Sequence, residues 1–321
     1  MNQRAFLVTG ATGFVGSALL ERLADHADHK VMALVRREGV VLPEHVVPLR
    51  ADADYLVGTE LSLADVQVLI HCAARVHVMA DSSSDPLAEY RKVNVEGTLK
   101  LAEQAARQGV RRFIFISSIK VNGEGTCTGE FYTADDVPAP ADAYGISKME
   151  AEQQLLSLGY RTGMEVVIIR PVLVYGPGVK ANFRSMMSWL SKGIPLPLGS
   201  IRNQRSLVAL DNLVDLIVTC LDHPAAANQT FLVSDGDDMS TTELLVRMGS
   251  ALNKPVRLIP IPAALLLKGA SLLGRKAVAQ RLCGSLQVDI RKTRELLGWE
   301  PPLTVAQALS KTAKSFQGSL K

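Results

Sequence analysis

The stretch Ala5-Phe6-Leu7-Val8-Thr9-Gly10-Ala11-Thr12-Gly13-Phe14-Val15-Gly16 decides the fold of this chain. It joins an apolar run to a turn with three evenly spaced glycines, and residues 17–24 follow with apolar side chains at helical spacing. Strand, glycine turn and helix in this order let backbone N–H groups approach a pyrophosphate at the positive end of the helix. The stretch therefore predicts a dinucleotide site. Its expected contacts are Gly10, Thr12, Gly13, Phe14, Val15 and Gly16.

Strand and helix patterns continue to alternate after this opening unit. Apolar runs at 30–35, 46–49, 66–70, 113–116 and 165–170 predict strands, and helices are expected over 17–24, 87–108 and 144–158. Such alternation is typical of an α/β protein with a doubly wound parallel sheet of the Rossmann type. We expect residues 1–177 and 206–233 to form the dinucleotide-binding domain. Residues 178–205 and 234–321 are then a smaller substrate-binding lobe.

Composition limits the other possibilities. The four cysteines show no C-x-x-C pairing, so neither a metal site nor a disulfide framework is predicted. The first strand follows residues 1–3 at once, which leaves no room for a signal peptide, and the apolar stretch 259–273 is interrupted by two prolines, a lysine and a glycine. We therefore predict a cytoplasmic protein without membrane insertion.

The net charge of +3 is unevenly distributed. Residues 254–321 hold twelve Lys and Arg against three acidic residues. This segment suits an anionic small molecule or an anionic surface, although a solvated face is the commoner explanation. Nucleic-acid binding is not expected, because the chain has two Trp and no aromatic-rich basic patch.

The end of the second strand bears on the choice of cofactor. Arg36 stands twenty residues beyond Gly16, with Arg37 next to it, where an acidic residue would bind the ribose of NAD and an arginine accommodates a 2′-phosphate. NADP(H) is therefore preferred and NAD(H) possible; the alternative is a pair of solvent-exposed arginines. Further cofactor contacts are expected from Asp52, Ala53, Ala73 and Ala74. His71, beside them, is interpreted as a hydrogen-bonded buried histidine.

A second group of residues carries the chemistry. Tyr144 and Lys148 are four apart, so on a helix they share one face, and a nearby ammonium favours the phenolate of a tyrosine. Ser118 follows the buried strand 112–116 and can bind the same substrate oxygen. The three predict proton exchange with an alcohol or a carbonyl oxygen. Alone, the Tyr-Lys pair is more often an exposed helix pair.

The order of these motifs resembles a known family. The glycine turn, Asn94-Val95-Glu96-Gly97-Thr98, Ser117-Ser118, Tyr144-x-x-x-Lys148 and Arg170-Pro171 are similar to the extended short-chain dehydrogenase/reductase superfamily, in its nucleotide-sugar branch. The resemblance covers nearly the whole chain. It implies that Tyr144, Lys148 and Ser118 are catalytic. It also implies that Asn94 and Pro171 line the cofactor site.

The resemblance further implies a UDP-sugar substrate and a homodimer. Its expected substrate contacts are Ser118, Lys120, Asn182, Arg205 and Arg281. Members usually pair through a four-helix bundle, here from the helices starting near Leu87 and Tyr144. The chain departs from the family pattern at Lys120, Asn122 and Leu173.

The reaction expected at this stage depends on the two arginines. A net reductase exchanges its cofactor in each turnover and commonly uses NADPH, so the lead hypothesis is reduction of the 4-keto group of a UDP-4-keto-6-deoxy-N-acetylhexosamine, as in the 4-reductases of O-antigen assembly that the chain also resembles. The alternatives are a UDP-hexose or UDP-N-acetylhexosamine 4-epimerase, reduction of a non-sugar ketone, and a non-catalytic NADP(H)-sensing protein.

Overall fold

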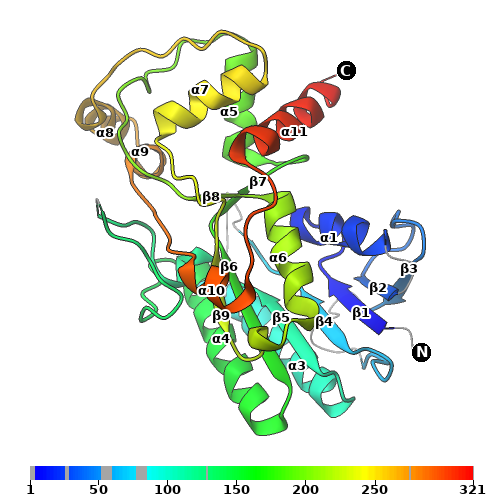
Figure 1. The fold of residues 1–321 in the computed structure, drawn as a ribbon. Helices are drawn as coiled ribbons and strands as arrows, with labels where there is room; N and C mark the ends of the chain where they lie inside the picture. The colour runs from blue at the N-terminus through cyan, green and yellow to red at the C-terminus, as the bar shows by residue number, and fades with distance from the viewer. Residues whose placement is uncertain are drawn as a thin grey trace.

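A computed structural model describes residues 4–25, 29–51, 60–76, 85–127, 129–274 and 276–320. Its centre is a seven-stranded sheet in the order β3-β2-β1-β4-β5-β6-β9, in which every pairing is parallel (Figure 1). The strands are β1 (Arg4–Thr9), β2 (His29–Val35), β3 (Val46–Arg50), β4 (Val68–His71), β5 (Arg112–Ile116), β6 (Glu165–Pro171) and β9 (Thr230–Val233). The predicted α/β class is confirmed.

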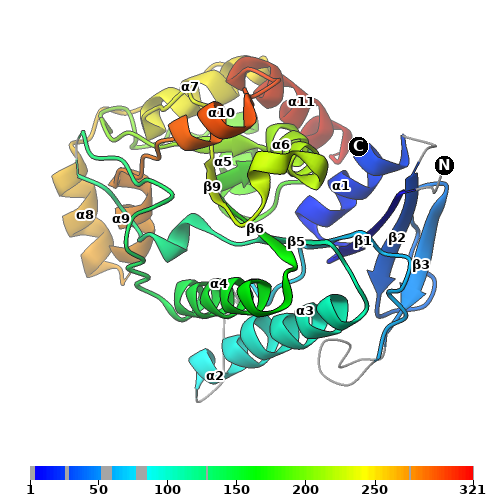
Figure 2. The same cartoon turned by 60° about the horizontal axis from the view of Figure 1, so that its bottom comes forward.

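Two helical layers cover the sheet (Figure 2). On one face, α1 (Phe14–Ala24) and α6 (Leu210–Asp222) contribute leucines and valines to a core shared with β1, β4, β5 and β6. On the other face, α3 (Thr98–Arg107) and α4 (Ala143–Thr162) complete a second core. The inner strands β1, β4, β5 and β6 are buried on both faces, which is why their sequences are largely apolar rather than alternating, whereas the edge strand β3 is mostly exposed.

The strand order reverses between β1 and β4, and this reversal positions the site. Thr9 pairs with His71, and Phe115 of β5 pairs with His71 from the other side, so three strand ends lie at one edge. Open α/β sheets bind ligands at the carboxyl edge, where the strand order reverses. The glycine turn after β1 and the serine loop after β5 both open onto that edge.

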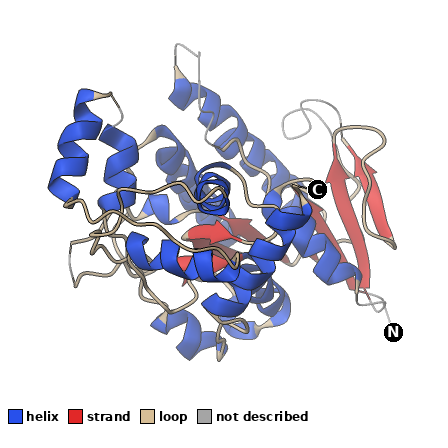
Figure 3. Ribbon diagram, turned by 90° about the horizontal axis from the view of Figure 1, so that it is seen from above, coloured by secondary structure: helices blue, strands red, loops and turns tan. Residues whose placement is uncertain are grey.

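A smaller lobe stands over this edge (Figures 1 and 3). It contains the helices α5 (Ala181–Ser191), α7 (Thr241–Ala251), α8 (Ala263–Leu272), α9 (Lys276–Cys283) and α11 (Val305–Gly318). The strand β7 (Leu173–Tyr175) pairs with β8 (Leu207–Ala209), and their side chains contribute both to the core of this lobe and to a core of the main sheet. Residues of α5, α7 and α11 share a third core. α10 (Arg291–Leu297) instead packs at the sheet, where Thr293 donates a hydrogen bond to the carbonyl of Leu232 at 2.7 Å. The domain boundaries predicted above remain a proposal.

Some elements differ from the sequence-based expectation. The helix expected over 87–108 is three consecutive segments: α2 (Pro86–Arg91), a π-helical turn η1 (Lys92–Gly97) and α3. Strand β7 is not among the predicted strands, and its pairing partner β8 is remote in sequence. In the described part of the chain no helix combines the length and the apolarity needed to cross a membrane.

Candidate active site

The glycine turn has the geometry that a dinucleotide requires. Gly10 has φ +68°, and a Cβ there would lie 2.7 Å from the backbone nitrogen of Ala73. A Cβ on Gly16 would lie 2.2 Å from the carbonyl oxygen of Gly10. The amide of Gly13 donates to the same oxygen at 2.8 Å, and α1 begins at the next residue without a side-chain cap. Uncapped first-turn amides at a helix N-terminus suit a phosphate, so these residues fit a dinucleotide.

The end of β4 closes against this turn. Ala73 is buried, and its amide donates to Oγ1 of Thr9 at 3.2 Å. His71 lies between the hydroxyls of Thr9, at 2.8 Å, and Thr98, at 3.0 Å, so the predicted hydrogen-bonded histidine is confirmed. Burial, with a smaller effect of Lys148, lowers the pKa of His71 to about 3, which keeps the ring neutral. Among the described residues no cluster of His, Cys, Asp or Glu could hold a metal ion.

The residues that follow strand β2 are exposed to solvent. Arg36 and Arg37 are both exposed, and Glu38 beside them forms an ion pair with Arg50. The predicted adenine-side contacts Asp52 and Ala53 lie outside the described residues.

Tyr144 and Lys148 occupy the first turns of α4, and Lys148 reaches the end of β5. Nζ of Lys148 donates to the carbonyl oxygen of Ile116 at 2.8 Å, two residues before Ser118. It also lies 4.3 Å from the centre of the Phe115 ring. Ser118 caps the short helix that follows β5, where its Oγ accepts from the amide of Lys120 at 3.3 Å. The fold thus directs residues from β5 and α4 to one edge of the sheet.

The pKa of Tyr144 is raised, whereas the spacing to Lys148 predicted a lowered pKa. Burial raises it, and Asp142 and Tyr90 raise it further. The Tyr90 ring lies edge-on at 6.0 Å. In this structure the Lys148 ammonium does not offset that shift, because it donates to a backbone carbonyl while the phenol is desolvated. Burial also lowers the pKa of Lys148, to about 8, although Glu152 opposes the shift. The lysine remains mostly protonated at neutral pH.

Sequence reasoning missed the buried network behind Lys148. Glu152 accepts from Oγ of Ser117 at 2.5 Å and forms an ion pair with Arg170 at 2.6 Å. Arg170 also donates to Oδ1 of Asn122 at 3.0 Å. The network ties α4 to β5, β6 and the serine loop. Its signal was present, since Glu152 follows Lys148 at the same four-residue spacing that separates Lys148 from Tyr144.

Asn94 performs a similar role from the π-helical turn. Its Oδ1 accepts from the amide of Arg75 at 2.8 Å, and its Nδ2 donates to Oγ of Ser147 at 3.0 Å. The side chain therefore joins the loop after β4 to α4, and π-helical turns are frequent at functional sites. A direct contact of Asn94 with the cofactor stays a prediction. Pro171 is buried at the carboxyl end of β6, pairing with Val233.

The predicted substrate contacts separate into three places. Arg205 donates to the carbonyl of Arg281 at 2.7 Å, so these two residues are neighbours. Asn182 is exposed in the first turn of α5, after Ala181 with its φ of +53°. Lys120 forms ion pairs with Asp142 and, at 3.0 Å, with Glu124. Asp142 also caps α4 by accepting from the amide of Gly145 at 2.7 Å.

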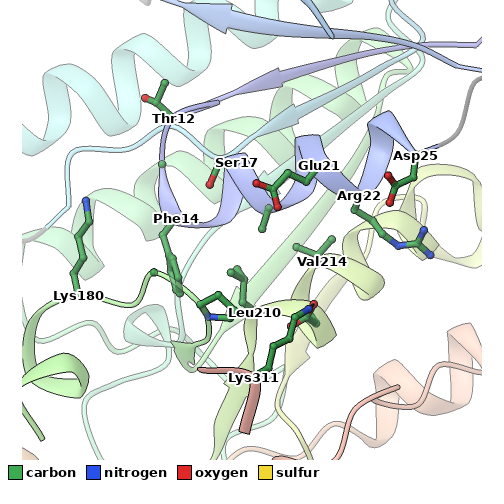
Figure 4. A pocket seen from close by; sticks show the side chains of 15 residues that line it. Thr12, Phe14, Ser17, Glu21, Arg22, Asp25, Lys180, Leu210, Val214 and Lys311 are labelled. Atoms are coloured by element: carbon green, nitrogen blue, oxygen red, sulfur yellow. Dashed lines mark hydrogen bonds and ion pairs between the residues drawn. The ribbon is translucent and has the colours of Figure 1, made fainter. Parts of the chain in front are cut away.

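A pocket of about 730 Å³ opens beside the glycine turn, between α1 and the start of α6 (Figure 4). Thr12 and Phe14 line one end, and Lys180 extends toward Thr12 from the segment before α5 (Figure 4). Neither Tyr144 nor Lys148 is among its described lining residues. The pocket therefore borders the expected phosphate position and not the expected reacting centre.

Comparison with known proteins places the chain in a family. The model of the NAD dependent epimerase/dehydratase family matches residues 6–234. The chain is 51% identical over 319 residues to UDP-glucose 4-epimerase of Vibrio cholerae, covering 98% of this chain and 95% of that protein. Its fold is similar to that of UDP-glucuronic acid 4-epimerase from Bacillus cereus in complex with NAD, with a TM-score of 0.79 and 20% identity over 99% of this chain and 100% of the other.

A second solved structure has the same fold. UDP-glucose 4-epimerase from Thermotoga maritima with UDP-glucose has a TM-score of 0.74 and 22% identity, and the match covers 99% of this chain and 100% of the other. At these identities the two structures show the fold alone.

These comparisons correct the predicted reaction. The 51% identity to a protein named as a 4-epimerase contradicts the expectation of a 4-ketoreductase, and with it the reading of the chain as a sensor. The error came from the weight given to Arg36 and Arg37, whose side chains are exposed and do not by themselves select NADPH. An epimerase regenerates its cofactor within each turnover, so it needs no arginine to select NADPH. The chain belongs to the NAD-dependent epimerase/dehydratase family, in the nucleotide-sugar branch of the extended short-chain dehydrogenases/reductases.

Proposed function

We propose that this protein interconverts UDP-glucose and its C4 epimer, UDP-galactose. The observation that carries the proposal is the 51% identity to the Vibrio cholerae UDP-glucose 4-epimerase, which extends over 98% of the chain. The arrangement of Ser118, Tyr144 and Lys148 at the carboxyl edge of the sheet supports it.

The cofactor in this proposal is NAD. The family description supports it, as do the glycine turn and the uncapped start of α1. When bound, the oxidised nicotinamide would accept a hydride from C4 of the sugar and return it to the same carbon. A preference for NADP, predicted from Arg36 and Arg37, has no other support; identifying the nucleotide released from denatured protein tests it.

In this proposal the side chains of the site transfer one proton to and from the sugar. Tyr144 accepts the proton of the C4 hydroxyl while that carbon is oxidised, and returns it when the carbon is reduced on its other face. Ser118 holds the same oxygen through a hydrogen bond. Lys148, held by the Ile116 carbonyl, is the proposed cation that stabilises the phenolate during proton transfer, against the burial that raises the pKa of the phenol.

The substrate lobe completes the proposal. Arg205 and the adjacent Arg281 offer cations for a diphosphate, and Asn182 offers an amide for the nucleotide-sugar. Lys120 could contact the substrate only after leaving its carboxylate partners. We also propose a homodimer through α3 and α4, where Leu156 and Tyr160 are 39% and 94% exposed. A cytoplasmic location is part of the same proposal.

One experiment tests the reaction. Purified protein is incubated with UDP-galactose without added nucleotide, and the products are resolved by NMR. Formation of UDP-glucose at catalytic rates supports the proposal. Failure to convert either hexose, with NAD added and the protein folded, would contradict it; the same assay with UDP-N-acetylglucosamine then tests the N-acetylated alternative.

A further inference from the structure

The hairpin formed by α8 and α9 lies at the outer end of the substrate lobe (Figures 1 and 2). None of the residues of α8 is buried, although the helix is rich in leucine. Three large apolar side chains of this region are at least half exposed: Leu265 at 59%, Leu272 at 90% and Leu273 at 77%. An exposed apolar cluster of this kind needs a physical explanation, because single exposed leucines are common but grouped ones mark interaction sites.

The two sides of α8 differ. Ala263 and Leu266 pack against the core of the lobe and hold the helix in place. Leu265, Lys268 and Leu272 follow at spacings of three and four, so they share the opposite face, and all three are exposed. We call this face, together with Leu273, Lys276 and Val278, the hairpin face. It combines an apolar surface with two lysines.

The charge around the hairpin has one sign. Residues 254–288 contain no Asp or Glu. Five of their basic residues are described and exposed: Lys254, Arg257, Lys268, Lys276 and Arg281. The preceding 253 residues carry a net negative charge, so the cations are concentrated here. The segment is therefore amphipathic and strongly cationic at once.

The combination of exposed leucines and lysines distinguishes between two possible binding partners, a second copy of the chain and a lipid surface. A second copy of the chain in a symmetric contact would bring the same lysines face to face, and like charges across an interface are unfavourable. A lipid surface with anionic headgroups satisfies both features, since leucines enter the boundary between headgroups and acyl chains while lysines stay among the phosphates. We propose that the hairpin face docks on an anionic lipid surface, without crossing it and independently of the reaction proposed above.

The test is sedimentation of the full chain with vesicles. The wild-type protein is mixed with phosphatidylcholine vesicles containing about 30% phosphatidylglycerol, and with pure phosphatidylcholine vesicles, at low salt. Two double variants of the hairpin face are compared with the wild type. One carries Leu265→Glu and Leu272→Glu, and the other carries Lys268→Glu and Lys276→Glu. The matched controls are Val137→Glu with Val246→Glu, and Lys192→Glu with Lys314→Glu, all at exposed positions elsewhere.

The expected result is binding of the wild type to the anionic vesicles, weakened by added salt. Because each basic residue near such a surface contributes about a fivefold factor, the double lysine variant should bind at least ~20-fold more weakly. The leucine variant should bind at least ~10-fold more weakly, and both controls should bind as the wild type does. Thermal melting is expected to be unchanged, since every altered side chain is exposed.

Two outcomes would overturn the proposal. One is a wild type that does not sediment with anionic vesicles, or hairpin variants that sediment as well as it does. The other is a wild-type oligomer that dissociates in the leucine variant, measured by light scattering, without vesicle binding; the hairpin face would then be an interface between copies.

Discussion

Glu152 lies one helical turn beyond Lys148 on α4, and its carboxylate is held in the interior by Arg170 at 2.6 Å. Both members of this ion pair are almost completely buried. The pair therefore serves two purposes. It fixes α4 against β6, and it places a negative charge near the lysine that the reaction is proposed to use.

We predict that Glu152→Gln destabilises the protein by about 3–5 kcal/mol, because Arg170 would become a buried charge without its partner. Urea unfolding measures this. The control is Glu150→Gln, two residues away, whose ion pair with Arg91 is partly exposed and screened by solvent, so that its loss should leave stability almost unchanged.

The same variant tests the electrostatic role of Glu152. Its carboxylate raises the pKa of Lys148 against the effect of burial, so its removal should lower that pKa below about 8. The alkaline limb of the pH–rate profile should then move to lower pH. If the alkaline limb of the pH–rate profile does not move in a folded variant, Glu152 has only a structural role.

Lys148→Met should increase stability near pH 7 while it reduces turnover. In the folded protein the pKa of this lysine is about 8, below its ordinary value of 10.5, so the folded state binds fewer protons between these values. Stability then rises with pH through this window, and below it the cost of the buried charge is fully present. Removing the ammonium should gain roughly 1–2 kcal/mol after loss of the Ile116 hydrogen bond.

Thermal melting of the Lys148→Met variant and the wild type at pH 7 and pH 10 measures this difference. The advantage of the variant should shrink at the higher pH, where the wild-type lysine is largely neutral. A variant that is less stable at both values would show that the hydrogen bond outweighs the desolvation.

Tyr144→Phe should lower the rate of epimerisation by at least ~100-fold, because a ring without the hydroxyl cannot exchange the proton of the sugar. The buried ring and its contact with Tyr90 remain, so nucleotide content and melting temperature should not change. Near-normal turnover in this variant would place the proton acceptor on another residue.

Gly16→Ala should prevent nucleotide binding and destabilise the protein by about 2 kcal/mol or more, since the new Cβ would lie 2.2 Å from the Gly10 carbonyl. Gly269→Ala is the matched control in a helix. A Cβ at Gly269 meets no described atom within 4 Å, and alanine is the better helix former, so this variant should be neutral or slightly stabilised. Nucleotide content after purification and thermal melting distinguish the two.

The local patterns were sufficient for most of the fold. Apolar runs predicted the strands β1 to β6 to within two residues, because the inner strands of a parallel sheet are covered on both faces and are therefore largely apolar. The glycine spacing predicted the turn after β1, because only glycine accepts the backbone position of Gly10 and the contact at Gly16. The family also followed from the sequence, since its motifs appear in a distinctive order.

Tertiary structure decided what depends on distant partners. The acidity of Tyr144 could not be predicted from its spacing to Lys148, because burial, Asp142 and Tyr90 set its direction. The strand β7 exists through its pairing with β8, and Asn94 bridges two elements that only the fold brings together. The exposure of Leu265 and Leu272 could not be predicted from the sequence either. Helical spacing placed them on one face, and only the packing of Ala263 and Leu266 showed that this face points to solvent.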